Sequence, residues 1–226
     1  MTKPPNPLHG LYVITDAALA RQRQLSVVDM VEAAIQGGAR LVQYRNKDAP
    51  PDVQAKEATA LARLCHANDV LFLVNDDVAL AQAVAADGVH LGQGDTGLSL
   101  ARAQLGPERI IGVTCHAQLA LARSAQAGGA DYVAFGRFFP SRTKPEAPPA
   151  EIAVLCQARM ELDIPVVAIG GITPANAASL LRCGADMLAV IHGVFAAPDI
   201  ATAADEYVRL FTLQSPHTSQ SVDTQA

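Results

Sequence analysis

The chain has 226 residues, of which 50% are hydrophobic and only 4% are aromatic. This length suits one large domain or two small ones, with a sizeable core built mainly from Ala, Val, Leu and Ile. The formal net charge of −5 argues against a nucleic-acid partner, because such partners favour a basic protein surface.

The sequence shows neither a targeting signal nor a membrane span. Residues 1–7 lack the apolar stretch of a signal peptide, and no run reaches the roughly 18 apolar residues of a membrane helix. The four cysteines lie far apart and form no C-x-x-C pair, which argues against a zinc knuckle or a redox dithiol. We expect Cys65, Cys115, Cys156 and Cys183 to be buried, reduced thiols in a cytoplasmic protein.

Eight short apolar runs, rich in Val and Ile, alternate along the chain with helical patterns. Their apolar residues are mostly continuous rather than alternating with polar ones, which is typical of strands buried on both faces in a parallel sheet. The runs are residues 11–15, 41–44, 71–74, 89–91, 110–114, 132–135, 165–169 and 187–191.

Helix-start signals occupy the gaps between the runs. Ser26 is a candidate N-cap with Asp29 three residues further on, and Thr173 is a candidate N-cap that precedes Pro174 at the first helical position. Residues 52–66 carry apolar side chains at helical spacing. The gaps between these runs are therefore predicted to be helices.

Eight strands alternating with helices predict a single α/β domain, a (β/α)8 TIM barrel. We place the barrel at residues 10–213, after an N-terminal extension of residues 1–9. Segment 214–226 is polar and lacks periodicity, so we expect it to be disordered. A doubly wound open sheet is the main alternative, although no G-x-G-x-x-G follows the first run.

The second run ends in a cluster of polar side chains at Gln43, Arg45 and Lys47. Alternate residues of a strand face the same side, so all three are expected to point toward the mouth of the barrel. Arg offers phosphate a bidentate fork, Lys a point charge, and Gln an amide for a heterocycle. An ordinary solvated strand end is the alternative, but three inward polar side chains would be costly without a partner.

The third and fourth runs end in acidic residues. Asp76 and Asp95 follow consecutive strands, which lie about 5 Å apart in a sheet, so the two carboxylates can meet at the rim. Two hard carboxylates beside a phosphate site are suited to Mg²⁺. Asp77 is expected instead to cap the next helix, and His90, which lies inside its strand, to be a satisfied core residue.

Later strand ends carry hydroxyls and glycines. Ser141, Thr143 and Lys144 follow the sixth run and suit a phosphate group, although a solvated turn is nearly as compatible with this S-x-T-K sequence. A pair of glycines ending at Gly171 follows the seventh run, where barrels often bind phosphate. Thr114, at the end of the fifth run, is a further candidate hydroxyl donor.

Taken together, these clusters resemble the motifs of the thiamine-phosphate synthase family. The resemblance runs from Leu11 to Phe195, with the motifs in the family's order: Q-x-R-x-K, N-D, H-L-G-Q-x-D, G-V-[ST]-x-H, G-x-x-x-P-[ST]-x-T-K and G-G-I. The family is a (β/α)8 barrel that condenses a hydroxymethylpyrimidine diphosphate with a thiazole phosphate, releasing thiamine phosphate and pyrophosphate. The resemblance thus implies two phosphorylated heterocyclic substrates and a Mg²⁺ cofactor.

The resemblance also implies which residues form the site. The pyrimidine diphosphate would be held by Gln43, Tyr44, Arg45, Asn46, Lys47, Asn75, Thr114 and Lys144. The thiazole phosphate would be bound by Ser141, Arg142, Thr143, Gly171, Ile191 and His192. The metal would be carried by Asp76 and Asp95. In a dissociative substitution, Arg45, Lys47 and Lys144 would offset the charge of the leaving pyrophosphate.

Two positions differ from the family pattern. Ile191 and His192 stand where the family commonly has Val-Ser, and Ser141 stands where it commonly has Thr. A thiazole tautomerase of the same superfamily is the nearest alternative, and its acid–base residue could be His116 or His192. A non-catalytic phosphate-binding barrel is a second alternative, against which the two retained acids argue. A homo-oligomer stays possible on this sequence.

Overall fold

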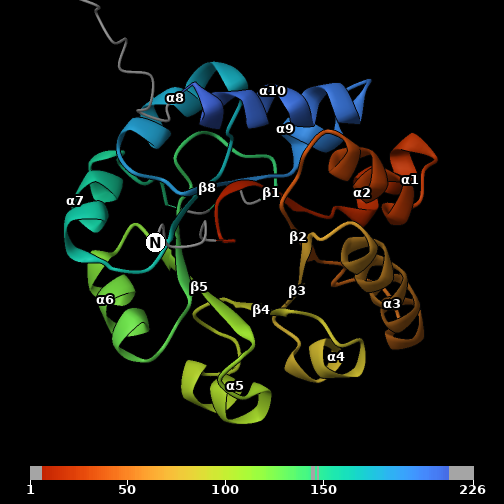
Figure 1. The fold of residues 1–226 in the computed structure, drawn as a ribbon, viewed down its shortest axis with the longest axis horizontal. Coiled ribbons are helices and arrows are strands. Elements are labelled where there is room, and N and C mark those ends of the chain that lie inside the picture. The colour runs from red at the N-terminus through yellow and green to blue at the C-terminus, as the bar shows by residue number, and fades with distance from the viewer. Residues whose placement is uncertain (1–6, 144–145, 147, 214–226) are drawn as a thin grey trace, which may run out of the picture.

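The computed structural model describes residues 7–143, 146 and 148–213, and at its centre is a closed barrel of eight parallel strands. Each strand pairs with the next, and β8 pairs with β1, which confirms the predicted barrel and excludes the open sheet. Figure 1 shows the strands at the centre and the helices around them. The strands are β1 (Gly10–Ile14), β2 (Leu41–Tyr44), β3 (Leu71–Asn75), β4 (Gly88–Leu91), β5 (Ile110–His116), β6 (Tyr132–Phe135), β7 (Val166–Ile169) and β8 (Met187–Val190).

Helices follow every strand and cover the outside of the barrel. The last helix, α10, packs against α2 and α8 and so closes the ring (Figure 1). The helices are α1 (Ala17–Arg23), α2 (Val27–Gln36), α3 (Pro51–Ala67), α4 (Val78–Ala83), α5 (Leu98–Leu105), α6 (Leu119–Ala127), α7 (Ala153–Glu161), α8 (Pro174–Arg182), α9 (His192–Phe195) and α10 (Ile200–Thr212).

Three predicted helix starts are confirmed. Ser26 and Asp29 form a capping box at the start of α2. The Asp77 carboxylate accepts a hydrogen bond of 2.8 Å from the backbone N–H of Leu80, as expected of an N-cap. Thr173 is the N-cap of α8, whose first residue is a proline. These signals act within one turn of helix, so they can be identified from sequence alone.

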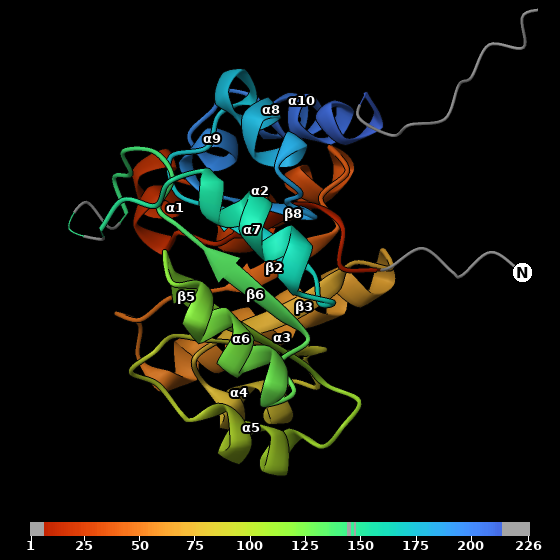
Figure 2. The same cartoon turned by 90° about the vertical axis from the view of Figure 1, so that its left-hand side faces the viewer.

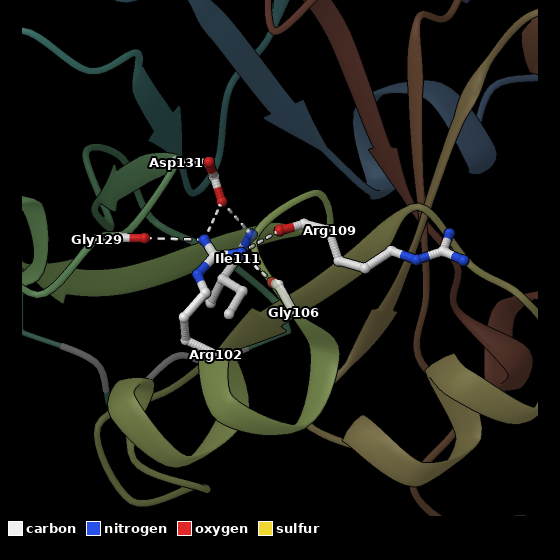
Figure 3. A network of polar contacts seen from close by, with 6 residues as sticks. All are labelled: Arg102, Gly106, Arg109, Ile111, Gly129 and Asp131. Carbon is white, nitrogen blue, oxygen red and sulfur yellow. Dashed lines mark hydrogen bonds and ion pairs between the residues drawn. The ribbon is translucent and has the colours of Figure 1, made fainter.

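Aspartates before three strands tie together the N-terminal end of the barrel. Each carboxylate accepts a hydrogen bond from a backbone N–H in the strand that precedes it in the chain. The three bonds join Asp87 to Phe72 (2.8 Å), Asp131 to Ile111 (2.7 Å) and Asp186 to Val166 (2.8 Å). Figure 3 shows that Arg102 extends one of them, donating to Asp131 and to nearby carbonyls. In barrels of this kind the N-terminal end serves stability.

Two hydrophobic clusters lie on opposite sides of the sheet. One fills the space between strands and helices, and the other fills the barrel interior. The interior cluster is Leu8, Tyr12, Ile14, Leu41, Leu73, Tyr132, Ala134, Val167, Met187 and Ala189. Two polar side chains, Gln43 and His90, are also buried on strands of the barrel.

One expectation about the cysteines is wrong. The structure joins Cys156 of α7 to Cys183, at the end of α8, in a disulfide, so these two are not reduced thiols. The two helices are neighbours in the ring, which brings together residues 27 positions apart in the chain (Figure 1). Cys65 and Cys115 are free and buried, and burial raises the pKa of both thiols to about 12.

The regular elements extend from Gly10 to Thr212, within the range predicted for the barrel. Residues 1–6 and 214–226 lie outside the described part of the chain, so disorder of the tail stays a prediction. In the ranges that are described, none of the helices combines the length and the apolar character needed to cross a membrane.

Candidate active site at the carboxyl ends of the strands

Side chains at the ends of β2 and β3 line a cleft of about 260 Å³. Among the residues lining this cleft are Tyr44, Arg45, Asn46, Lys47, Asn75 and Asp76, all predicted site residues. The cleft opens at the carboxyl ends of the strands, the end at which barrels of this fold carry their active sites. Polar residues that the sequence singled out at two separate strand ends therefore line the same cleft.

The backbone of Arg45 is held from the neighbouring strand end. The N–H of Arg45 donates to the hydroxyl of Thr15 (2.8 Å), and this hydroxyl donates to the carbonyl of Arg45 (3.2 Å). Gln54 of α3 donates to the carbonyls of Asn46 and Ala49, both at 2.9 Å. Sequence reasoning missed Thr15 and Gln54, although Thr15 is a polar residue at the end of an apolar run, the same signal that singled out Gln43.

Lys47 and Asp76 form an ion pair across the cleft. Asp76 adopts a left-handed backbone conformation, with φ of 63°, directly after β3. Its N–H donates to the carbonyl of His90 (2.9 Å), which ties this turn to β4. The Lys47 side chain remains 53% exposed, so its ammonium group is accessible to a ligand.

The carboxyl groups of Asp76 and Asp95 share a hydrogen bond. Burial opposes ionisation of Asp76, but hydrogen bonds to Asp95 and Lys47 outweigh it and hold its pKa below the ordinary value. The bond to Asp76, together with burial, raises the pKa of Asp95. Of the two carboxyl groups, Asp76 is therefore the one that ionises more readily.

This pair of carboxyl groups fits a divalent cation. Two hard oxygen donors lie next to each other, and both could contact one divalent cation. Within the described ranges, no group of three or more His, Cys, Asp or Glu side chains could hold a metal. The remaining ligands would therefore come from water and from a bound anion.

Gln43 and Thr114 lie deeper, toward the barrel interior. Gln43 is 2% exposed, and its amide donates to the hydroxyl of Tyr12. The Thr114 hydroxyl lies 2.8 Å from Nε2 of His90. His90 is thus a hydrogen-bonded interior residue, as expected from the sequence.

Tyr44 and Asn46 have a partner on α3. The Tyr44 hydroxyl donates to the Glu57 carboxylate (2.7 Å), as does the Asn46 amide (2.9 Å). The Tyr44 ring is buried in the cluster between strands and helices. Both residues line the cleft, but their polar groups hold the strand end against α3.

The loop after β6 lies along the glycine turn after β7. Phe138 and Phe139 donate backbone hydrogen bonds to the carbonyls of Ile169 (3.2 Å) and Gly170 (3.0 Å). Gly171 has φ of 63°, and a Cβ added there would lie 2.3 Å from the carbonyl oxygen of Pro140. Only glycine fits this close approach. In Figure 2 the β6 arrow points toward this loop, which marks the carboxyl-end side of the barrel.

The predicted thiazole phosphate residues flank this junction. Ser141, Arg142 and Thr143 follow in the same loop, whereas Lys144 lies outside the described residues. Ile191 packs against the interior cluster at the end of β8, and His192 begins α9. Residues from three separate strand ends are therefore found at the same end of the barrel.

Comparisons with known proteins agree with this geometry. The family model described as thiamine monophosphate synthase matches residues 11–194. The chain belongs to the thiamine-phosphate synthase family. It is 54% identical to the thiamine-phosphate synthase of Alcanivorax borkumensis over 87% of this chain and 89% of that protein. It is 51% identical to that of Thioalkalivibrio sulfidiphilus, over 93% and 99%.

A solved structure agrees in both fold and sequence. The thiamine phosphate pyrophosphorylase of Pyrococcus furiosus superposes with a TM-score of 0.82 and 36% identity, over 92% of this chain and 97% of that one. The chain is therefore an enzyme of the thiamine-phosphate synthase family, a transferase of thiamine biosynthesis.

Proposed function

We propose that this enzyme joins hydroxymethylpyrimidine diphosphate to thiazole phosphate, giving thiamine phosphate and pyrophosphate. The observation that carries the proposal is the cluster of Arg45, Lys47 and Asp76 on one cleft, with Asp95 next to Asp76. Two cations and an acidic pair suit a diphosphate with a divalent metal. A tautomerase would have no use for such a cluster.

Arg45 and Lys47 would bind the diphosphate, with Lys144 as a third cation. The bond between the methylene carbon and the diphosphate oxygen breaks, and its electron pair leaves with pyrophosphate. The cations offset the charge that grows on this leaving group. The lone pair of the thiazole nitrogen then forms the new carbon–nitrogen bond, so the electrons balance without a protein nucleophile.

Asp76 and Asp95 would hold Mg²⁺, which when bound supplies further positive charge against the diphosphate oxygens. In the structure, Lys47 forms an ion pair with the Asp76 carboxylate. We infer that Lys47 transfers its contact to the substrate when the diphosphate enters, since a phosphate oxygen and a carboxylate compete for one ammonium group.

The glycine turn at Gly171 and the loop Ser141–Thr143 would bind the thiazole phosphate. Backbone N–H groups can approach a phosphate closely where no Cβ intervenes. Binding both substrates at one rim raises the effective concentration of the nitrogen at the carbon that it attacks. Gln43, Asn75 and Thr114 would hold the pyrimidine part.

The test is a coupling assay with purified protein and both substrates, with and without Mg²⁺. The proposal predicts equal amounts of thiamine phosphate and pyrophosphate, formed only with the metal. Folded protein that binds the thiazole phosphate but forms neither product would contradict it. That result would favour the tautomerase, with His116 and His192 as the first residues to replace.

A further inference from the structure

A chain of hydrogen bonds crosses the barrel interior from one predicted substrate residue to another. Gln43 Nε2 donates to the Tyr12 hydroxyl, which lies 3.0 Å from the Tyr132 hydroxyl. The Tyr132 hydroxyl lies 2.9 Å from His90 Nδ1, and His90 Nε2 lies 2.8 Å from the Thr114 hydroxyl. Five strands of the barrel (Figure 1) thus contribute one side chain each.

The packing holds these hydrogen-bonded side chains rigidly. Tyr12 and Tyr132 are at most 1% exposed, and their rings meet edge to face with centroids 6.2 Å apart. The His90 ring stacks on Tyr132 at 5.6 Å. A Cβ at Gly112 would lie 1.9 Å from the Tyr132 ring, so this strand position must be glycine to make room for the tyrosine.

The number of protons on each group determines which atom donates in each of these hydrogen bonds. Burial raises the pKa of both phenols, so each keeps its single proton. Tyr12 accepts a hydrogen bond from Gln43 and must donate its own to Tyr132. Among the contacts of the described residues, the Tyr132 hydroxyl is the acceptor that the Tyr12 hydroxyl can reach. Tyr132 must then donate to Nδ1 of His90. An unprotonated Nδ1 requires that neutral His90 carry its proton on Nε2.

A protonated Nδ1 would break the chain. His90 would then donate to Tyr132, and Tyr132 would donate to Tyr12. The Tyr12 hydroxyl would accept from both Tyr132 and Gln43, and its own proton would have no acceptor among the described residues. A buried donor without a partner is costly. The Nδ1–H tautomer therefore conflicts with the hydrogen bond that Gln43 donates to Tyr12.

We propose that Tyr12 and Tyr132 are positioning residues, which hold His90 as the Nε2–H tautomer so that Thr114 turns its hydroxyl proton toward the pyrimidine diphosphate. The part that concerns the substrate rests on the proposed function. Thr114 accepts from His90, so its own proton is available as a donor at the rim. A donor suits an anionic or lone-pair-bearing ligand, whereas the opposite tautomer would present a lone pair to it.

The first test reads the tautomer directly in ligand-free protein. Two-bond ¹H–¹⁵N spectra of histidine-labelled protein at pH 8 distinguish the two ring nitrogens, and His90→Asn identifies the signals of His90. We expect a neutral Nε2–H ring. In Tyr132→Phe, the Nδ1 resonance should move to that of a nitrogen that accepts no hydrogen bond.

Tyr207→Phe is the matched control. It also removes a buried tyrosine hydroxyl, one that donates to the carbonyl of Ile172 (2.9 Å), and should leave the His90 signals unchanged. An Nδ1–H or doubly protonated His90 in the wild type would overturn the proposal. So would a Tyr132→Phe spectrum that is the same as the wild-type spectrum.

The second test measures energetic coupling to Thr114. We expect Tyr132→Phe and Thr114→Val each to lower kcat/KM for the pyrimidine diphosphate by about tenfold, and the double variant to lose no more than either. The KM for the thiazole phosphate should not change. Additive losses would indicate general loosening of the barrel and would contradict a positioning role.

Two further outcomes separate a failure of this proposal from a folding failure and from a failure of the proposed function. If Tyr132→Phe does not fold, Tyr12→Phe replaces it in the cycle, because it interrupts the same chain one step earlier. A wild-type protein with the expected tautomer that makes no thiamine phosphate would contradict the proposed function. That result would also overturn the substrate part of this proposal, while the tautomer itself would stand.

Discussion

The Tyr44 hydroxyl donates a hydrogen bond of 2.7 Å to the Glu57 carboxylate, which ties the end of β2 to helix α3. Burial, together with Glu57, raises the pKa of this hydroxyl, so it stays protonated and keeps donating. Family resemblance assigned Tyr44 to the diphosphate. That assignment stays a prediction, and the contact with Glu57 shows in addition that Tyr44 supports the strand end that precedes Arg45.

Tyr44→Phe should therefore affect stability more than catalysis. Removing the hydroxyl should lower the free energy of unfolding by ~1 kcal/mol, with kcat/KM within about threefold of wild type. Urea unfolding and the coupling assay measure the two quantities. A large loss of activity at unchanged stability would mean that Tyr44 contacts the substrate.

Asp76→Asn should stop synthesis in a folded protein. The change removes the charge but keeps the shape, so we expect kcat to fall on the order of a hundredfold or more, without rescue by added Mg²⁺. The measurement is a Mg²⁺ titration of the coupling assay. Wild-type rates in the folded variant would exclude Asp76 as a metal ligand.

The adjacent Asp77 provides the control for this change. Its carboxylate caps α4 at Leu80, so Asp77→Ala should cost ~1 kcal/mol of stability and leave the Mg²⁺ dependence unchanged. The two variants differ by one position in the chain. An equal loss of activity in both variants would mean that the effect of Asp76→Asn comes from a change in local structure and not from the loss of a metal ligand.

Gly171→Ala should weaken binding of the thiazole phosphate. The added Cβ would lie 2.3 Å from the carbonyl of Pro140, so the turn and the loop after β6 must separate. We expect the KM for this substrate to rise roughly tenfold, equivalent to ~1.4 kcal/mol. Steady-state kinetics with each substrate varied in turn give the value.

Gly129→Ala separates backbone strain from steric overlap. Gly129 also has a left-handed backbone, with φ of 84°, but nothing lies within 4 Å of a Cβ added there. This variant should lose ~1 kcal/mol of stability and keep both KM values. Equal kinetic effects of the two substitutions would contradict a role for the Gly171 turn in substrate binding.

Arg102→Lys should destabilise the barrel without changing its kinetics. Arg102 donates to Asp131 (2.6 Å) and to the carbonyls of Gly106, Arg109 and Gly129, as Figure 3 shows. A lysine keeps the charge but cannot reach four acceptors, so unfolding should become easier by roughly 2 kcal/mol. Thermal unfolding and the coupling assay test both statements.

The exposed pair Arg209–Asp205 is the control for that experiment. Its side chains are 73% and 43% exposed, and such surface pairs contribute about 0.5 kcal/mol or less. Arg209→Lys should therefore leave the unfolding midpoint almost unchanged. A comparable loss in both variants would mean that replacing any arginine by lysine destabilises this protein, and that the carbonyl contacts of Arg102 are not the cause.

The barrel could be predicted from sequence because its signals are local. Every observed strand begins and ends within two residues of a predicted apolar run. The caps at Ser26 and Asp77 act within four residues of chain, and the order of strands follows the order of runs. The pairing of Cys156 with Cys183 was not predictable in this way, because it depends on which helices become neighbours.

The candidate site also has features that the sequence predicts and features that only the fold reveals. The sequence alone located the polar strand ends and the family motifs, because a run of apolar residues and a motif are both read along the chain. Only the fold showed that Tyr44 faces Glu57 and that Tyr12 meets Tyr132, 120 residues away. The direction of a side chain depends on partners from other elements, and those partners come together only when the barrel closes.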